Sequence, residues 1–86
     1  MLSEKVEFIR RSRLEIMYNI LSLCQRGENK KTHIMYRCNL SFKQVQKYLE
    51  TLTSMGLLSA NQGLYELTEK GEKFLKEFQD LKRLLD

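Results

Sequence analysis

The sequence predicts one mainly α-helical domain with a small β-hairpin and a long C-terminal helix, and three observations lead to this prediction. Apolar residues recur at helical spacing in separate segments of the 86-residue chain. Two short apolar runs, 57–60 and 64–67, flank Asn61-Gln62-Gly63, a sequence typical of a tight hairpin turn. The length corresponds to one domain, 1–86, whose limited core a partner subunit would help to stabilise.

The first helix is expected to begin after Ser12, because Ser12 and Glu15 have the spacing of a capping box. A broad apolar face follows, which indicates that this is the central packing helix. That face comprises Leu14, Met17, Tyr18, Leu21 and Cys24, widened by Ile16, Ile20 and Leu23. Residues 25–29 are predicted to form a loop around Gly27. Residues 1–9 also show near-helical apolar spacing, and they either extend this helix or lie across the body.

A short second helix is expected after Thr32, a suitable N-cap residue, with Ile34, Met35 and Cys38 directed inward. Residues 39–40 then form a tight connection to a third helix, 42–55. Ser41 and Gln44 form its capping box, and Gly56 supplies the left-handed residue that ends it. The buried stripe of this third helix consists of Val45, Leu49 and Leu52.

The opposite face of the third helix is polar and contains two cations and one acid. It consists of Lys43, Gln44, Gln46, Lys47, Glu50, Thr51 and Ser54. Donors and acceptors on short or medium side chains suit a helix that lies in the major groove of DNA. On this stretch alone, the solvated face of an ordinary surface helix is an equally good interpretation.

The order helix, helix, helix and hairpin is that of a winged helix-turn-helix, with a body at 11–67. The predicted wing tip carries neither lysine nor arginine. Thr68 is expected to cap a last helix within 68–86. Its apolar line after Gly71 comprises Phe74, Phe78, Leu81 and Leu85, with Leu75 and Leu84 on its flanks. These side chains exceed what a small body can cover, so we expect a dimerisation helix; the alternative is that it folds back over the first helix.

Charge is unevenly distributed along the chain. The net charge is +4, and the whole excess lies within residues 1–38. A pI near 9.2 fits a polyanionic partner without establishing one. Cys24 and Cys38 do not form a CxxC pair and are expected to be reduced, buried thiols, so neither a metal nor a cofactor is expected.

No apolar run reaches transmembrane length and the start of the chain lacks a signal-peptide core, which favours a cytoplasmic protein. Phosphate-loop, GxSxG and HExxH motifs do not occur, so an enzyme is not expected. His33 is expected to be exposed, with a phosphate contact as the alternative. Tyr36 and Tyr48 can stack on bases in a single-strand binder, but beside core residues they are expected to be half-buried.

Four segments, RSRLEIMYNIL, KKTHIMYRCNLS, QVQKYLETLTSMGLL and YELTEKGEKFL, together resemble the archaeal winged-helix regulators. That group includes small ten-kilodalton chromatin-associated proteins. The resemblance extends from Arg11 to Leu85, and IMYRCNLS and LTEKG are its most specific parts. It implies a DNA-binding winged helix dimerised through the C-terminal helix as an antiparallel coiled coil. The chain departs from the pattern in the little positive charge on its wing and in a C-terminal helix shorter than three heptads.

We therefore predict a homodimeric, double-stranded DNA-binding protein, either a transcriptional regulator or a nucleoid-associated factor. The expected major-groove residues are Lys43, Gln44, Gln46 and Lys47, with Ser41 and Thr51 at the margins. The expected phosphate contacts are Lys30, Lys31 and Arg37, with Arg10, Arg11 and Arg13 as further candidates. A protein-interaction module without strong DNA binding is the alternative, and an RNA-binding winged helix is the third interpretation.

Overall fold

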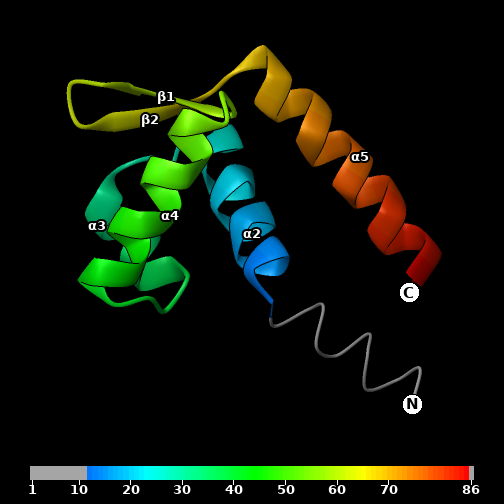
Figure 1. Ribbon diagram of the computed structural model, residues 1–86, viewed down its shortest axis with the longest axis horizontal. Coiled ribbons are helices and arrows are strands. Elements are labelled where there is room, and N and C mark those ends of the chain that lie inside the picture. The colour runs from blue at the N-terminus through cyan, green and yellow to red at the C-terminus, as the bar shows by residue number, and fades with distance from the viewer. Residues whose placement is uncertain (1–11, 86) are drawn as a thin grey trace.

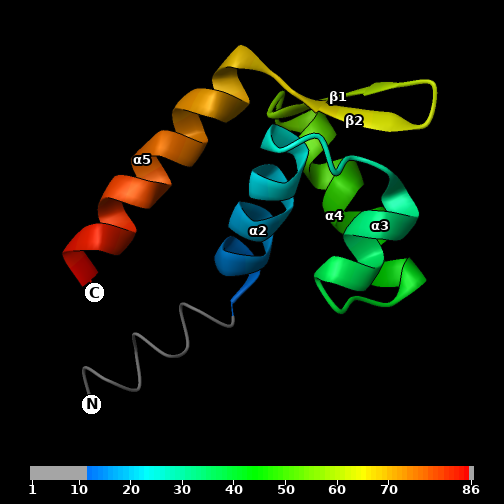
Figure 2. The same cartoon turned by 180° about the vertical axis from the view of Figure 1, so that it is seen from behind.

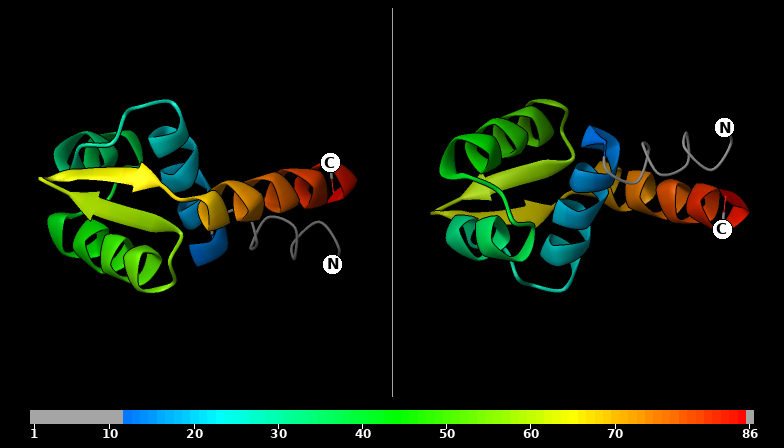
Figure 3. Two further views of the ribbon diagram at one scale, coloured as in Figure 1. Left: turned by 90° about the horizontal axis from the view of Figure 1, so that it is seen from above. Right: turned by 90° about the horizontal axis from the view of Figure 1, so that it is seen from below.

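The computed structural model describes residues 12–85, which form four helices and one antiparallel hairpin (Figure 1). The elements are α2 (Arg13–Gln25), α3 (Lys31–Arg37), α4 (Phe42–Ser54), β1 (Leu58–Asn61), β2 (Leu64–Leu67) and α5 (Glu69–Leu85). Seen from behind, α3 lies in front of α4 and α2 stands beside them, with the hairpin at one end (Figure 2). The views from above and from below show α5 projecting to one side of the other elements (Figure 3). The expectation for residues 1–9 lies outside the described residues.

Helix α2 begins where the sequence predicts, but the expected capping box is wrong. Ser12 occupies the N-cap position, and its side chain makes no capping hydrogen bond to α2. Glu15 instead accepts a hydrogen bond from Nζ of Lys82 on α5, at 3.2 Å. Leu14, expected on the apolar face, is 37% exposed, whereas Ile20 and Leu21 are fully buried.

Helix α3 begins earlier than predicted, with Lys30 rather than Thr32 at the N-cap. The reason is a contact distant in sequence: the Tyr65 N–H donates to the Asn29 carbonyl at 3.0 Å, and Lys30 forms an isolated antiparallel bridge with Leu64. This pairing holds the backbone extended up to Lys30, so the helix starts immediately after it. Thr32 therefore lies inside the first turn of α3.

Helix α4 has the capping box, the buried stripe and the C-terminal glycine that the sequence predicts. The Gln44 N–H donates to Ser41 Oγ at 3.1 Å, and the Ser41 N–H donates to Gln44 Oε1 at 2.9 Å. The predicted stripe of Val45, Leu49 and Leu52 is buried. The helix ends at Ser54, and Gly56 follows it with a φ of +77°.

The hairpin has a two-residue turn, within the limit of three tip residues that the sequence predicts. Asn61 pairs with Leu64 inside the ladder, so Gln62 and Gly63 alone form the turn. Both have positive φ, at +52° and +82°, as a type I′ turn requires. The exposed tip contains no charged side chain.

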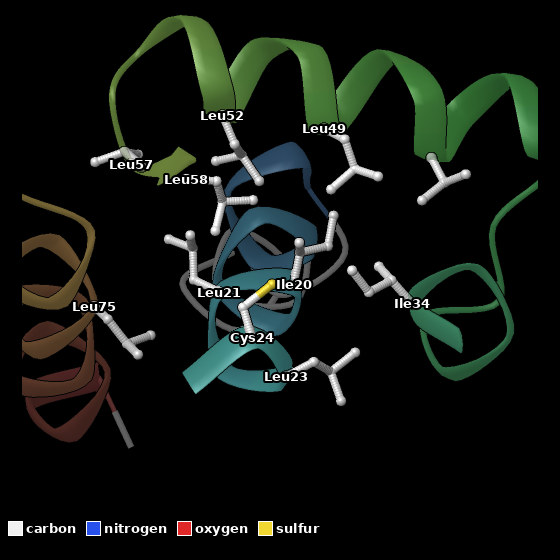
Figure 4. Close-up of a cluster of buried hydrophobic side chains, with 11 residues drawn as sticks. Ile20, Leu21, Leu23, Cys24, Ile34, Leu49, Leu52, Leu57, Leu58 and Leu75 are labelled. Atoms are coloured by element: carbon white, nitrogen blue, oxygen red, sulfur yellow. The ribbon is translucent and has the colours of Figure 1, made fainter. Parts of the chain in front are cut away.

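The core lies between α2 and the other elements (Figure 4), and Leu57 and Leu58 complete it from the start of the hairpin. Helix α5 joins this core through Leu75, on the flank of its apolar line, and through Phe78. Its N-terminus is held closely: the Thr68 hydroxyl donates to the Gly56 carbonyl at 2.6 Å and accepts from the Gly71 N–H at 2.9 Å. Lys70 Nζ donates to the Met55 carbonyl at 2.8 Å, at the C-terminal end of α4. The first turn of α5 is thus fixed to the last turn of α4.

Candidate nucleic-acid interface

The outward face of α4 carries the predicted groove-reading cations. Lys43 and Lys47 are exposed one helical turn apart, opposite the buried stripe, and Thr51 is exposed one turn further along. Ser41 and Gln44 are exposed at the start of the helix, but their side-chain oxygens are used in the capping box. The structure therefore places these residues on the exposed side of α4, and two of them, Ser41 and Gln44, also stabilise the start of the helix.

Gln46 is held between two helices. Its Oε1 accepts a hydrogen bond from Lys31 Nζ on α3, and its Nε2 donates to Glu50 at 2.8 Å. Lys31 Nζ also lies 4.2 Å from the centre of the Phe42 ring, a cation–π geometry. The sequence predicts Gln46 and Lys31 as separate base and phosphate contacts, and the structure joins them as one link between α3 and α4.

The remaining predicted phosphate contact on α3, Arg37, belongs to a charge cluster around Glu28. Arg37 lies 3.7 Å from this carboxylate, Arg26 3.5 Å and the His33 ring nitrogen 2.7 Å. The His33 hydrogen bond, helped by the charges of Arg37 and Arg26, holds the pKa of Glu28 below its ordinary value of 4.5. Sequence reasoning did not select Arg26, because only the fold brings the loop to the end of α3.

The exposure of three ring-bearing residues can be compared with the sequence-based expectations, and one of the three differs. His33 is exposed and Tyr48 is half-buried, as predicted, but Tyr36 is 79% exposed rather than half-buried. Helix α3 has only 7 residues and buries Ile34, so Tyr36, two positions on, points away from the core. Lys30 is exposed beside β2, and Arg13 is exposed at the start of α2. Arg10 and Arg11 lie outside the described residues.

The two cysteines are free thiols, with Cys24 buried and Cys38 half-buried. Burial raises the pKa of Cys24 to about 12 and also raises the pKa of Cys38 above its ordinary value. Both are therefore protonated at neutral pH. Within residues 12–85, no cluster of three His, Cys, Asp or Glu side chains could hold a metal ion. Over the same range, no helix has both the length and the apolar character needed to cross a membrane.

The four predicted dimerisation residues divide into two groups. Phe78 is 6% exposed and stacks on Tyr18 of α2, while Phe74 is half-buried beside it. Leu81 and Leu85 are 48% and 44% exposed on the last turns of α5, and the flanking Leu84 is 84% exposed. The face of α5 that carries Phe78 thus packs on α2, as in the fold-back alternative, and the last turns of α5 present uncovered leucines.

Comparison with known proteins decides the family, because the winged helix-turn-helix family matches residues 10–86. The chain belongs to the winged helix-turn-helix family. The uncharacterised protein MJ0287 of Methanocaldococcus jannaschii is 35% identical over 77 residues, which cover 90% of this chain and 79% of that protein. MJ0290, an uncharacterised protein of the same organism, is 34% identical over 77 residues, and the matched part is 36% of its length.

A solved structure agrees with this assignment. Sso10a-2, a DNA-binding protein from Sulfolobus solfataricus, has a TM-score of 0.63 and 30% sequence identity to this winged helix protein. The match covers 86% of this chain and 84% of that one. The predicted winged helix-turn-helix fold with a long C-terminal helix, and its resemblance to archaeal proteins, are confirmed.

Proposed function

We propose that this winged helix protein binds double-stranded DNA with α4 in the major groove. The observation that carries the proposal is the outward face of α4, where Lys43 and Lys47 are exposed on a helix that its capping box and buried stripe hold in place. The similarity to a protein described as DNA-binding supports it. In this arrangement Lys43, Lys47 and Thr51 enter the groove, while Ser41 and Gln44 lie at its margin.

Cations on neighbouring elements would contact the phosphates. Lys30 and Lys31 stand at the start of α3 and Arg37 at its end, so they can set the register of α4 without reading sequence. Gln46 has a different role in this proposal from the one its position in the sequence suggests. Because Lys31 and Glu50 hold its amide, it fixes the angle between α3 and α4, and base reading would require those two bonds to open.

The protein in this proposal is a cytoplasmic homodimer that acts as a transcriptional regulator or nucleoid-associated factor. The exposed leucines at the end of α5 supply the dimer contact, and Phe74 extends the same apolar strip. Linking two α4 helices allows both to bind one duplex, which raises the overall affinity through effective concentration.

A gel-shift titration with random duplex DNA at low salt tests DNA binding. Micromolar affinity that weakens as salt rises is the expected result, because phosphate contacts release counterions. Absent or millimolar binding would instead support a protein-interaction module, which the uncharged hairpin tip favours. Competition by duplex RNA at equal strength would point to an RNA-binding winged helix.

A further inference from the structure

A pocket of about 410 Å³ opens between the start of α2 and one side of α4. Arg13 and Met17 line it from α2, and Lys47, Tyr48 and Met55 line it from α4 and the residue that follows. Its volume lies within the range of small-molecule sites, roughly 300–1,000 Å³. The hydrophobic core ends behind it, since Met17 and Tyr48 are half-buried against the core cluster.

The walls of this pocket combine two kinds of chemistry. Two thioethers and a phenol ring provide an apolar surface of the kind that accepts a flat aromatic group. Arg13 and Lys47 bring a positive charge from each of the two helices, and the described residues that line the pocket include no carboxylate. A guanidinium and an ammonium facing one pocket favour a carboxylate ligand.

A DNA phosphodiester matches the two positive charges of the pocket but not its apolar surface. It would pair with Arg13 and Lys47, but it has no apolar body to cover Met17, Tyr48 and Met55. An aromatic carboxylate matches both, with its ring between the methionines and its charge toward the two cations.

We propose that this pocket binds an aromatic monocarboxylate and that the bound acid displaces DNA. Gln44 and Thr51 also line the pocket, so with Lys47 three residues of the proposed DNA-reading face would contact the ligand. Ligand and duplex would therefore compete for the same side chains. The competition rests on the proposed DNA binding, whereas the ligand site does not.

The chain has four methionines, which allow a direct test by methyl NMR on protein labelled at the methionine methyl groups. The probe is 2-naphthoate, and 2-naphthamide is its uncharged counterpart. We expect naphthoate to shift the Met17 and Met55 signals through the ring current, and the Met35 signal to stay in place because Met35 packs on the core from α3. The amide should bind about threefold to tenfold more weakly, as expected for the loss of a partly exposed ion pair.

Variants that remove one positive charge distinguish binding in the pocket from a general attraction of naphthoate to a positively charged protein. Arg13→Gln and Lys47→Gln are changes at exposed positions that leave the core intact, and each should weaken naphthoate binding by about threefold to tenfold. Lys73→Gln, an equivalent change at an exposed position on α5, should have no effect. Unshifted Met17 and Met55 signals at millimolar naphthoate, or equal affinities for acid and amide, would overturn the site.

Duplex binding followed by fluorescence anisotropy tests the displacement separately. At a naphthoate concentration about nine times its own dissociation constant, exclusive binding raises the apparent Kd for the duplex about tenfold. If the methyl signals shift and the duplex affinity stays constant, the displacement is wrong and the ligand site stands. If the protein binds no duplex at all, the proposed function fails, the displacement fails with it, and the methyl shifts still decide the ligand site.

Discussion

Tyr18 of α2 stacks on Phe78 of α5, with the ring centres 4.9 Å apart and the planes at 27°. Lys82 reinforces this contact, because its Nζ lies 4.8 Å from the centre of the Tyr18 ring and also bonds Glu15. Phe74 continues the aromatic group, with its ring centre 6.5 Å from that of Phe78. These contacts make the first part of α5 a component of the core.

Replacing Phe78 with alanine should therefore destabilise the fold itself. Loss of a buried phenylalanine lowers the free energy of unfolding by about 3–5 kcal/mol. Urea denaturation followed by circular dichroism measures the change. Glu77→Ala, at an exposed neighbouring position on α5, is the matched control and should stay within about 0.5 kcal/mol. A comparably small effect for Phe78→Ala would show that the stacking contributes little.

Replacing Gly71 with alanine is a useful test, because the expected change in stability is opposite to that of an ordinary helical glycine. In an ordinary helix interior, glycine to alanine is stabilising by about 0.5–1 kcal/mol. Here an added Cβ would come within 2.2 Å of the Leu57 carbonyl oxygen and 2.7 Å of a Leu67 methyl group. Gly71→Ala should therefore destabilise by roughly 1–3 kcal/mol, because α5 must move away from the hairpin. A gain in thermal stability would contradict this close approach, and Lys73→Ala on the same helix serves as the reference.

The Glu28 cluster predicts a pH dependence. The folded-state pKa of Glu28 lies below its ordinary value of 4.5, so its contribution to stability is complete above that value and disappears as pH falls through the folded pKa. Glu28→Gln should be less stable than the unmodified protein at neutral pH, and the difference should vanish on acidification. Denaturant midpoints of both proteins across this range measure it, with Glu72→Gln on α5 as the control. A difference that persists at low pH would indicate a loss of packing instead of charge.

The sequence predicts well those features whose causes are local. The Ser41 capping box and the stripe of α4 depend on residues within a few positions of one another, and both form as expected. The start of α3 could not be predicted, because it depends on the pairing of Asn29 with Tyr65 in the hairpin. The Gln46 side chain likewise has its partner on another helix, since Lys31 precedes it by 15 positions.

The same distinction applies to α5. Its spacing places Phe74, Phe78, Leu81 and Leu85 on one line. How far the body covers that line depends on Tyr18, a residue 60 positions away from Phe78, so periodicity alone cannot separate the core residues from the exposed ones.

For DNA binding, the double change of Lys43 and Lys47 to alanine is the decisive variant. It should weaken binding to all duplexes and flatten the slope of log affinity against log salt by up to about two units, because each cation neutralises one phosphate. Lys73 and Lys76, exposed on α5, form the control pair and should leave the slope unchanged. An unaltered slope in the Lys43 and Lys47 variant would mean that this face of α4 does not meet DNA.

The proposed dimer should be tested at the exposed leucines near the end of α5, which take no part in the stacking contact with α2. Leu81 and Leu85 are 48% and 44% exposed, so aspartate at both positions removes the apolar contact without entering the core. Phe78 is unsuitable, because its replacement by aspartate would place a charge against Tyr18. About half of each leucine is left to bury, so a dimer contact contributes roughly 0.7–1.5 kcal/mol per leucine, and four leucines across two chains can stabilise association.

We therefore expect Leu81→Asp with Leu85→Asp to yield a monomer whose body remains folded. Its DNA affinity should decrease, because the two α4 helices are no longer linked. Sedimentation measures the association state, and circular dichroism measures the fold. The exposed pair Lys73→Gln and Lys76→Gln lowers the net charge of the same helix by the same two units and controls for the change in charge. If the unmodified protein already sediments as a monomer at micromolar concentration, the leucines at the end of α5 do not form a dimer.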